Sequence, residues 1–272
     1  MYIISAVIEK ERTAVALLDK EYKLCLKKEG VRADLVTLCS EVISEGGINA
    51  ADVLYAGVAV DGSVGCHSKA ASELEKSTGI KCFSASLADA KALGEAYYLN
   101  DADTLVLLTV DEEIECGIVI GKKAYAGTYR NGRNVAHTVI SFDGFECSCG
   151  RRGCFEAYAC NSGFNRIVAE AGIDGALTHS ELFAMNTPEA DYAKKLYVEY
   201  LSAGITNIIN LFQPRHLVLD GPFTKVGDAL MAPMMDIILR EQYTHSMPNK
   251  CDVRFANTDA DTALIGAALL GR

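Results

Sequence analysis

The chain has 272 residues, of which 50% are hydrophobic and 23% are charged, with 26 Lys and Arg against 36 Asp and Glu. This composition supports a sizeable core and excludes intrinsic disorder, collagen-like repetition and coiled coil. The net charge of −10 disfavours contact with phosphate backbones, so we expect no nucleic acid partner for this chain alone. No apolar run approaches the roughly 20 residues that span a bilayer. We therefore expect no membrane partner, no secretory signal and a cytoplasmic location.

Apolar periodicity predicts an alternation of strands and helices along the chain. The first half is expected to contain, in order, strands at 2–8 and 13–18, a helix at 34–43, a strand at 53–60, a helix at 69–77, a strand at 80–83 and a helix at 87–99. The second half is expected to contain strands at 104–109, 116–120 and 136–141, helices at 164–171, 180–184 and 189–212, a strand at 216–220, and helices at 225–242 and 261–270.

A polar break at 100–103 separates the two halves, and no low-complexity segment or tight repeat interrupts the alternation. We therefore predict an α/β protein of two lobes. The N-terminal lobe is expected to span 1–105 and to be completed by the C-terminal helix at 261–272. The second lobe is expected to span 106–260 and to contain a zinc site.

The ten cysteines of the chain indicate a reducing compartment, where cysteines act as core residues or metal ligands. Cys147, Cys149 and Cys154 lie within eight residues, beside two glycines that permit tight turns. This spacing suits one tetrahedral Zn²⁺, with His137 as the expected fourth ligand. Four protein ligands leave no position for water, so such a zinc is structural. The alternative is a reactive or merely buried cysteine cluster, and the other seven cysteines are expected to be small buried hydrophobes.

The stretch from His137 through Cys147-x-Cys149-Gly-x-x-Gly-Cys154-Phe-Glu156 resembles the signature of the ROK family of repressors, open reading frames and sugar kinases. Three further segments resemble that family in the same order: Leu93–Glu95, Asn207–Gly221 and Ala263–Leu270. The resemblance extends over nearly the whole chain. It implies the two-lobed actin-like ATPase (ribonuclease H-like) fold, with sugar and ATP meeting in the cleft between the lobes. It also implies self-association, so we expect a homodimer.

The chain departs from the family at the first phosphate loop, whose sequence in the family is Asp-x-Gly-Gly-Thr-Lys. Its glycines let backbone N–H groups approach the phosphates of ATP. Residues 7–12 stand at these positions, so Val7 replaces the aspartate while Glu9 and Lys10 replace the glycines. We therefore expect two carboxylates, those of Glu9 and Glu11, to face the triphosphate.

The second phosphate loop, Gly-Thr-Gly-Ile-Gly-Gly-Gly in the family, aligns with residues 111–117. Four acidic residues stand in place of the glycine-rich sequence that binds phosphate: Asp111, Glu112, Glu113 and Glu115. Like charges 4 Å apart repel by about 1 kcal/mol in water and by about 4 kcal/mol at an effective dielectric constant of 20. Acids can instead hold Mg²⁺, but the lost glycines still block a close approach. The sequence of this loop therefore disfavours binding of ATP and Mg²⁺.

The resemblance places the catalytic base, an aspartate that accepts the sugar hydroxyl proton, at Leu87. Leucine cannot accept a proton, so we expect no catalytic residue there. The alternative base is the neighbouring Asp89, but it lies two residues further along the same helix and faces elsewhere.

The resemblance also gives three substrate-binding positions: Asn134, where the family has Glu, and His137 and Glu156, which match it. The alternative for Glu156 is a solvated carboxylate at the start of a helix, favoured by the helix dipole. Gly221 matches a cofactor-binding glycine near the adenine, followed here by Pro222. The alternative for Gly221 is an ordinary turn at the end of a strand.

These departures favour a degenerate ROK protein, a pseudokinase that keeps the fold and the zinc. Such a protein is expected to bind a small sugar or a protein partner, or to act as a regulatory subunit. One alternative is an active ATP-dependent hexose or N-acylhexosamine kinase with unusual loops. A second alternative is a transcriptional regulator whose DNA contacts come from a separate chain.

Overall fold

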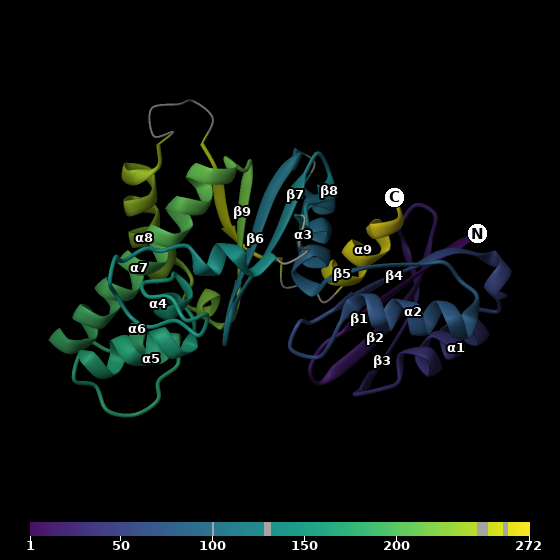
Figure 1. Ribbon diagram of the computed structural model, residues 1–272, viewed down its shortest axis with the longest axis horizontal. Coiled ribbons are helices and arrows are strands. Elements are labelled where there is room, and N and C mark those ends of the chain that lie inside the picture. The colour runs from purple at the N-terminus through teal and green to yellow at the C-terminus, as the bar shows by residue number, and fades with distance from the viewer. Residues whose placement is uncertain (100, 128–131, 244–249, 258–260) are drawn as a thin grey trace. The chain divides into compact units, whose positions relative to one another are not determined.

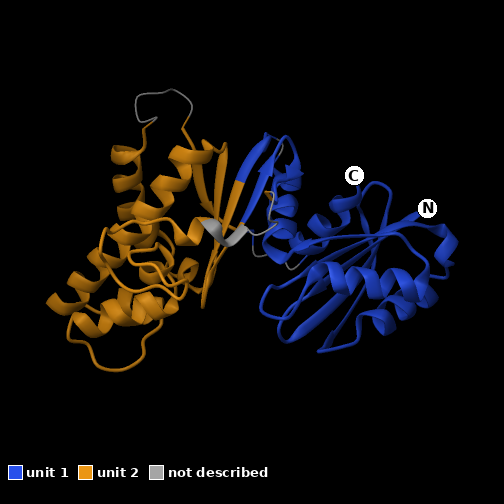
Figure 2. Ribbon diagram, viewed as in Figure 1, with its two compact units in different colours: residues 1–105, 117–126, 257–272 blue, residues 106–116, 127–256 orange. Residues whose placement is uncertain are grey.

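The computed structural model describes residues 1–99, 101–127, 132–243, 250–257 and 261–272, with backbone alone at 132–134. Its internal contacts divide the chain into two compact units, shown in Figure 2. The first unit comprises residues 1–105, 117–126 and 257–272, and the second comprises 106–116 and 127–256. The C-terminal segment thus returns to the unit in which the chain begins.

The first unit contains a five-stranded sheet in the order β3-β2-β1-β4-β5 (Figure 1). Its strands are β1 (Tyr2–Ile8), β2 (Arg12–Asp19), β3 (Leu24–Val31), β4 (Val53–Val60) and β5 (Cys82–Ser86). Strands β1, β2 and β3 pair antiparallel, whereas β4 and β5 continue the sheet parallel to β1. The helices of this unit are α1 (Leu35–Glu45), η1 (Ala50–Asp52), α2 (His67–Thr78), α3 (Leu87–Tyr98), α9 (Thr262–Ala268) and η4 (Leu269–Gly271).

Alternating side chains of β1 reach the two faces of this sheet, as a strand requires. Ile4 and Ala6 join a core formed with α1 and α2, whereas Ile3 and Val7 join a second core formed with α3 and α9. Both faces are therefore covered by helices. This explains why β1 has apolar residues at most positions on both faces, with Ser5 as the exception, rather than an alternation.

Glycines allow α9 to lie directly against its neighbours. A Cβ atom built on Gly266 would lie 1.6 Å from the carbonyl oxygen of Ala90 in α3. One built on Gly57 in β4 would lie 1.8 Å from the carbonyl oxygen of Ala267. Both distances are far shorter than any van der Waals contact, so these two positions accept no side chain unless the backbones separate.

The second sheet has the order β10-β9-β6-β7-β8. Its strands are β6 (Thr104–Val110), β7 (Ile114–Ile120), β8 (Lys123–Ala124), β9 (His216–Asp220) and β10 (Asp252–Phe255). If the strands of each sheet are numbered in chain order, both sheets have the spatial order third, second, first, fourth, fifth. The two sheets therefore have the same topology. The helices between these strands are η2 (Gly132–His137), α4 (Glu156–Ala159), α5 (Asn161–Glu170), α6 (His179–Ala184), α7 (Pro188–Phe212), η3 (Pro222–Val226) and α8 (Asp228–Glu241).

The predicted strand at 136–141 is wrong. Residues 136 and 137 end the 3-10 helix η2, and Val139 forms only an isolated bridge with Cys154. The predicted helix at 225–242 is also wrong at its start, because Gly227 separates η3 from α8 with a φ of 66°. The other predicted elements are present with shifted ends, and the long helix α7 stops before Pro214 as expected.

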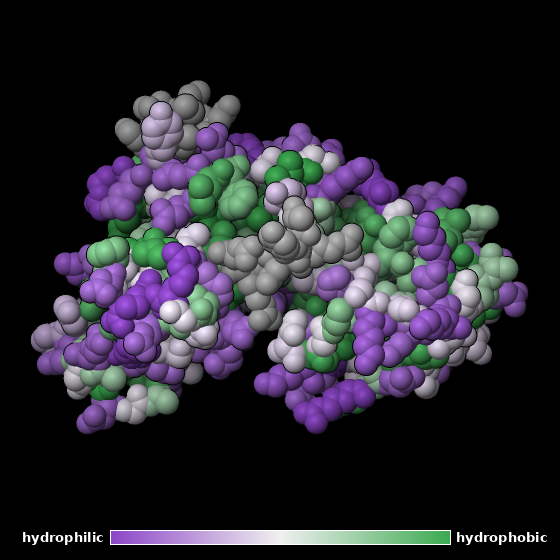
Figure 3. All heavy atoms as spheres, viewed as in Figure 1, coloured by the Kyte–Doolittle hydropathy of each residue, from purple (hydrophilic) through white to green (hydrophobic). Residues whose placement is uncertain are grey.

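In the described ranges, no helix combines the length and the apolar composition that crossing a membrane requires. Hydrophilic side chains cover much of the face shown in Figure 3, with apolar residues scattered among them.

Among the seven cysteines outside the cluster, Cys25 and Cys66 are exposed, so the expectation that all seven are buried is wrong.

Candidate functional site

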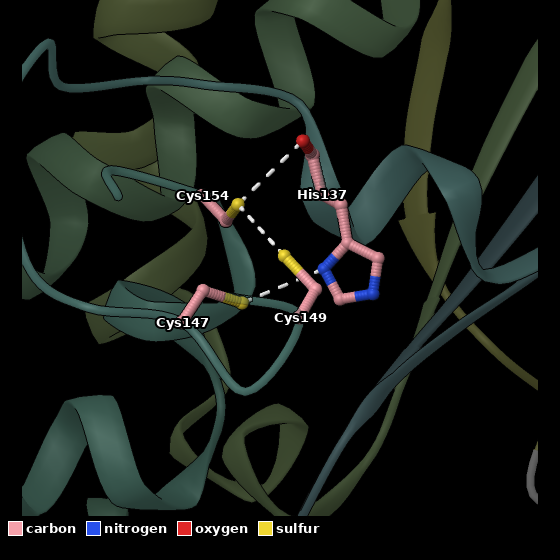
Figure 4. A group of neighbouring side chains, drawn as sticks. All are labelled: His137, Cys147, Cys149 and Cys154. Atoms are coloured by element: carbon pink, nitrogen blue, oxygen red, sulfur yellow. Dashed lines mark hydrogen bonds between the residues drawn. The ribbon is translucent and has the colours of Figure 1, made fainter. Parts of the chain in front are cut away.

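The four expected metal ligands of the second unit converge on one point, as Figure 4 shows. The Nδ1 atom of His137 lies 3.5 Å from the Sγ atom of Cys147, and the Sγ atoms of Cys149 and Cys154 lie 3.7 Å apart. All four ligand atoms lie within 4.8 Å of one another. The sequence spacing had predicted this set of residues.

Two glycines shape the loop that carries the cysteines. The backbone N–H of Gly150 donates to the carbonyl oxygen of Cys147, and Gly150 and Gly153 adopt φ angles of 83° and 75°. A Cβ atom on Gly153 would lie 1.8 Å from the carbonyl oxygen of Ser141. Only glycine fits this turn, because the position demands both a left-handed backbone and an absent side chain.

The geometry fits a tetrahedral zinc ion. With Zn–S bonds of 2.3 Å and Zn–N bonds near 2.05 Å, the edges of the tetrahedron are about 3.8 Å between sulfurs and about 3.6 Å between sulfur and nitrogen. The observed edges of 3.7 and 3.5 Å agree with these values. The four side chains therefore form a group that could hold a metal ion.

The thiols of the cluster differ in acidity. A hydrogen bond from the backbone N–H of Arg151 lowers the pKa of the Cys149 thiol. Burial raises the pKa of the Cys154 thiol to about 12. Cys154 is therefore protonated at neutral pH without a metal, and metal binding must release its proton.

Glu156 lies beside the cluster and is buried, with a relative exposure of 7%. Its Oε1 atom accepts a hydrogen bond from the Ser148 hydroxyl at 3.0 Å and lies 4.0 Å from Nδ1 of His137. Its Oε2 atom accepts from the backbone N–H of Ile114 at 3.3 Å. The alternative of a solvated carboxylate at a helix start is therefore wrong. The side chain of Asn134 lies outside the part of the chain whose side chains the structure describes.

The acidic turn between β6 and β7 is held by Asn161, the first residue of α5. Its side-chain amide donates to Oδ1 of Asp111 at 2.7 Å and to Oε1 of Glu112 at 3.2 Å. Its backbone N–H donates to the carbonyl oxygen of Asp111 at 2.8 Å. The carboxylates thus have fixed positions. Sequence analysis missed Asn161, because it lies 50 residues away from Asp111 and carries no motif of its own.

The two carboxylates of the turn between β1 and β2, which we expected to face a triphosphate, each form an ion pair with an arginine. Glu9 forms an ion pair with Arg12 at 2.8 Å, and Glu11 forms one with Arg32 at 2.7 Å. These ion pairs offset the negative charges of the two carboxylates. The loss of glycine remains, because Glu9 and Lys10 carry side chains where the backbone would have to approach a ligand.

Leu87, at the expected position of the base, is 5% exposed and packs in the core between β1, α3 and α9. Ser86 caps α3: its hydroxyl accepts from the backbone N–H of Asp89 at 3.1 Å and donates to Oδ2 of Asp89 at 2.8 Å. Asp89 is 7% exposed. Its carboxylate is therefore engaged at the start of its own helix.

Gly221 directly follows β9 with a φ of 130°, and a Cβ atom there would lie 2.1 Å from the carbonyl oxygen of Val110 in β6. This close approach accounts for the glycine without any ligand, in line with the alternative of a strand-end turn. Pro222 lines a cavity of about 620 Å³ together with Glu112, Asn161 and Lys225.

The model of the ROK family matches residues 36–272. The chain belongs to the ROK family. A glucokinase from Thermotoga maritima is 27% identical over 217 residues, which cover 72% of this chain and 67% of that protein. A putative xylose repressor from Caldicellulosiruptor is 28% identical over 199 residues, which cover 63% of this chain and 48% of that repressor.

Solved ROK structures share the fold of the whole chain. A ROK hexokinase from Thermus thermophilus superimposes with a TM-score of 0.85 at 22% identity, covering 99% of this chain and 98% of the other. A ROK glucokinase from Streptomyces griseus, in complex with glucose and AMPPNP, superimposes with a TM-score of 0.70 at 19% identity, covering 98% of each chain. The expectation of the actin-like ATPase fold is confirmed.

One residue of this ROK chain that sequence analysis missed is His179, which lines the same cavity as Pro222. Its ring stacks on Phe164 with centroids 3.9 Å apart, and its Nε2 atom lies 3.1 Å from the hydroxyl of Tyr197. The Tyr197 hydroxyl uses its own proton to donate to the carbonyl oxygen of Ala159. Nε2 of His179 is therefore protonated and donates to the Tyr197 oxygen. Burial lowers the pKa of His179 to about 4, so the imidazole is neutral at pH 7.

The neutral state of His179 predicts a specific loss of stability in acid. Its pKa falls from an ordinary 6.5 to about 4 on folding, so between these values only the unfolded chain binds the proton. The corresponding stability is complete above pH 6.5 and is lost as the pH falls toward 4, by on the order of 3 kcal/mol. Urea unfolding of the wild type and of His179→Gln at several pH values should show the wild type losing more stability in this window. Parallel curves would contradict the assignment.

Proposed function

We propose that this ROK chain retains a sugar site and a structural zinc ion but does not transfer a phosphoryl group from ATP. The observation that carries the proposal is Leu87. In family members a carboxylate at this position accepts the proton of the sugar hydroxyl, and leucine has no atom that accepts a proton. Leu87 is 5% exposed and packs in the core of the first unit.

Asp89 is a poor substitute for the missing base. Its carboxylate is 7% exposed and is bound to the hydroxyl of Ser86, the N-cap of α3. A general base must reach the proton it removes within hydrogen-bond distance. Moving Asp89 toward a substrate would break the contact with Ser86 that stabilises the start of its helix.

The acidic turn at 111–113 also opposes ATP. Asn161 holds the carboxylates of Asp111 and Glu112, so neither is free to swing away from an approaching phosphate. Glycine backbone N–H groups, which bind phosphate oxygens in the family, are absent at these positions. The turn at 9–12 adds side chains but no net negative charge, so the second turn makes the larger electrostatic contribution.

A sugar remains the best-supported ligand class. Nδ1 of His137 faces the cysteines, which leaves Nε2 of its ring for a sugar hydroxyl. Oε1 of Glu156 already accepts from Ser148 and Cys147, whereas Oε2 accepts from the backbone N–H of Ile114 and has a second lone pair for a sugar hydroxyl. The Streptomyces griseus glucokinase, solved with glucose, supports the same ligand class.

Isothermal titration calorimetry tests this proposal with two kinds of ligand. The panel contains glucose, mannose, xylose and their N-acetylated amino analogues, followed by Mg-ATP with and without the best sugar. We expect a saturable signal for at least one sugar and none for Mg-ATP. A Kd for Mg-ATP below about 1 mM, within the range of functional substrates, would favour the active kinase instead.

A further inference from the structure

The segment that carries the cysteines also holds the acidic turn at two points. Glu156 and Asn161 lie at the starts of the consecutive helices α4 and α5, directly after Cys154. Glu156 accepts from the backbone N–H of Ile114, and Asn161 binds the side chains of Asp111 and Glu112. Both anchors therefore belong to a stretch of eight residues that begins at a metal ligand.

The position of Glu156 depends on the cluster. Helix α4 has four residues, which is too short to be stable by its own backbone hydrogen bonds. Its first turn begins with the backbone N–H of Ala157 donating to the carbonyl oxygen of Cys154. Ser148, which donates to Oε1 of Glu156, lies between Cys147 and Cys149 in the same loop. The cluster thus fixes both the backbone and one hydrogen-bond partner of Glu156.

We propose that Glu156 is a positioning residue that couples metal occupancy of the cluster formed by His137, Cys147, Cys149 and Cys154 to the order of the turn at 111–114. Metal binding closes the loop, the closed loop holds the carboxylate, and the carboxylate holds the N–H of Ile114. Loss of the metal lets the loop open, which withdraws the Ser148 and Cys147 donors from Oε1 of Glu156. A buried carboxylate that loses its donors is unstable and moves to water, so the N–H of Ile114 is released as well. The coupling rests on contacts within the second unit and does not depend on whether the chain binds ATP.

Hydrogen exchange of the Ile114 amide tests this coupling, with zinc content measured on the same samples. We expect Glu156→Ala to keep one equivalent of zinc and to exchange the Ile114 amide at least about tenfold faster. Glu156→Gln should restore most of the protection, because its carbonyl oxygen still accepts the hydrogen bond. Glu170→Ala, which removes an exposed carboxylate from the end of α5, is the control and should change nothing.

A second measurement decides the case even if Glu156→Ala does not retain zinc. Wild-type protein is treated with a chelator, and amides of Val58 and Ile265 in the first unit report whether the fold persists. We expect the Ile114 amide to lose protection while those two amides keep theirs. Unchanged exchange at Ile114 after metal removal, or in Glu156→Ala with zinc bound, would overturn the proposal. Neither readout involves a nucleotide or a sugar, so its failure is distinct from failure of the proposed function.

Discussion

Cys149→Ser is expected to abolish zinc binding and to lower the thermal midpoint of unfolding by about 10 °C or more, which corresponds to a loss of roughly 4 kcal/mol or more. The reason is the small core beneath the loop. Four buried residues form it, with three partly buried neighbours: Cys147, Cys154, Ala157 and Tyr158, with Ile140, Phe145 and Tyr200. So small a core does not by itself keep the loop at 138–153 closed. The four bonds to the metal supply the remaining stabilising free energy.

Elemental analysis and differential scanning calorimetry measure the two parts of this expectation. Wild-type protein purified without chelators should contain one equivalent of zinc per chain, and Cys149→Ser should contain none. Cys25→Ser, at an exposed cysteine of the first unit, is the matched control and should behave like the wild type. A wild-type protein without metal that unfolds at the same temperature as one loaded with zinc would contradict a structural role.

Gly266→Ala is expected to destabilise the first unit by roughly 3 to 5 kcal/mol, near the upper end of single substitutions. The added methyl group would lie 1.6 Å from the carbonyl oxygen of Ala90, so α3 and α9 must move apart. Both helices cover one face of the first sheet, and their separation exposes the core that contains Leu87 and Leu264.

Gly65→Ala provides the control for this substitution, because its added Cβ atom meets nothing within 4 Å and its φ is not in the left-handed region. It should change the free energy of unfolding by less than about 0.5 kcal/mol. Denaturation in urea, followed by circular dichroism, measures both variants. Equal stability of the two variants would show that α3 and α9 do not touch as the structure has them.

The elements that the sequence predicted well are those whose own residues determine them. Strand β4 (Val53–Val60) is an apolar run closed by a turn dipeptide, and α7 is bounded by Thr187 and by Pro214. Strand β3 (Leu24–Val31) was not predicted, because it lies at the edge of the sheet and none of its residues is buried. The strand predicted at 136–141 fails because its first residues end η2 and Ile140 packs against the core beneath the cysteine cluster instead of pairing in a sheet.

The candidate site likewise contains residues that the sequence predicts locally and contacts that only the fold creates. The metal ligands were predictable because three cysteines within eight residues are a local signal. The pairing of Glu11 with Arg32, 21 residues away, and of Asp111 with Asn161, 50 residues away, depends on the fold. Counting carboxylates in the sequence therefore overstated the charge of the turn at 9–12 and understated how firmly the turn at 111–113 is held.

The absence of phosphoryl transfer is tested most directly by ADP formation, measured in a coupled assay with saturating Mg-ATP and each sugar of the panel. We predict the same background rate with and without sugar, and no change in Asp89→Asn. Sugar-dependent ADP formation at about 1 s⁻¹ or faster, in the range of working enzymes, and abolished by Asp89→Asn, would contradict this prediction and make Asp89 the base.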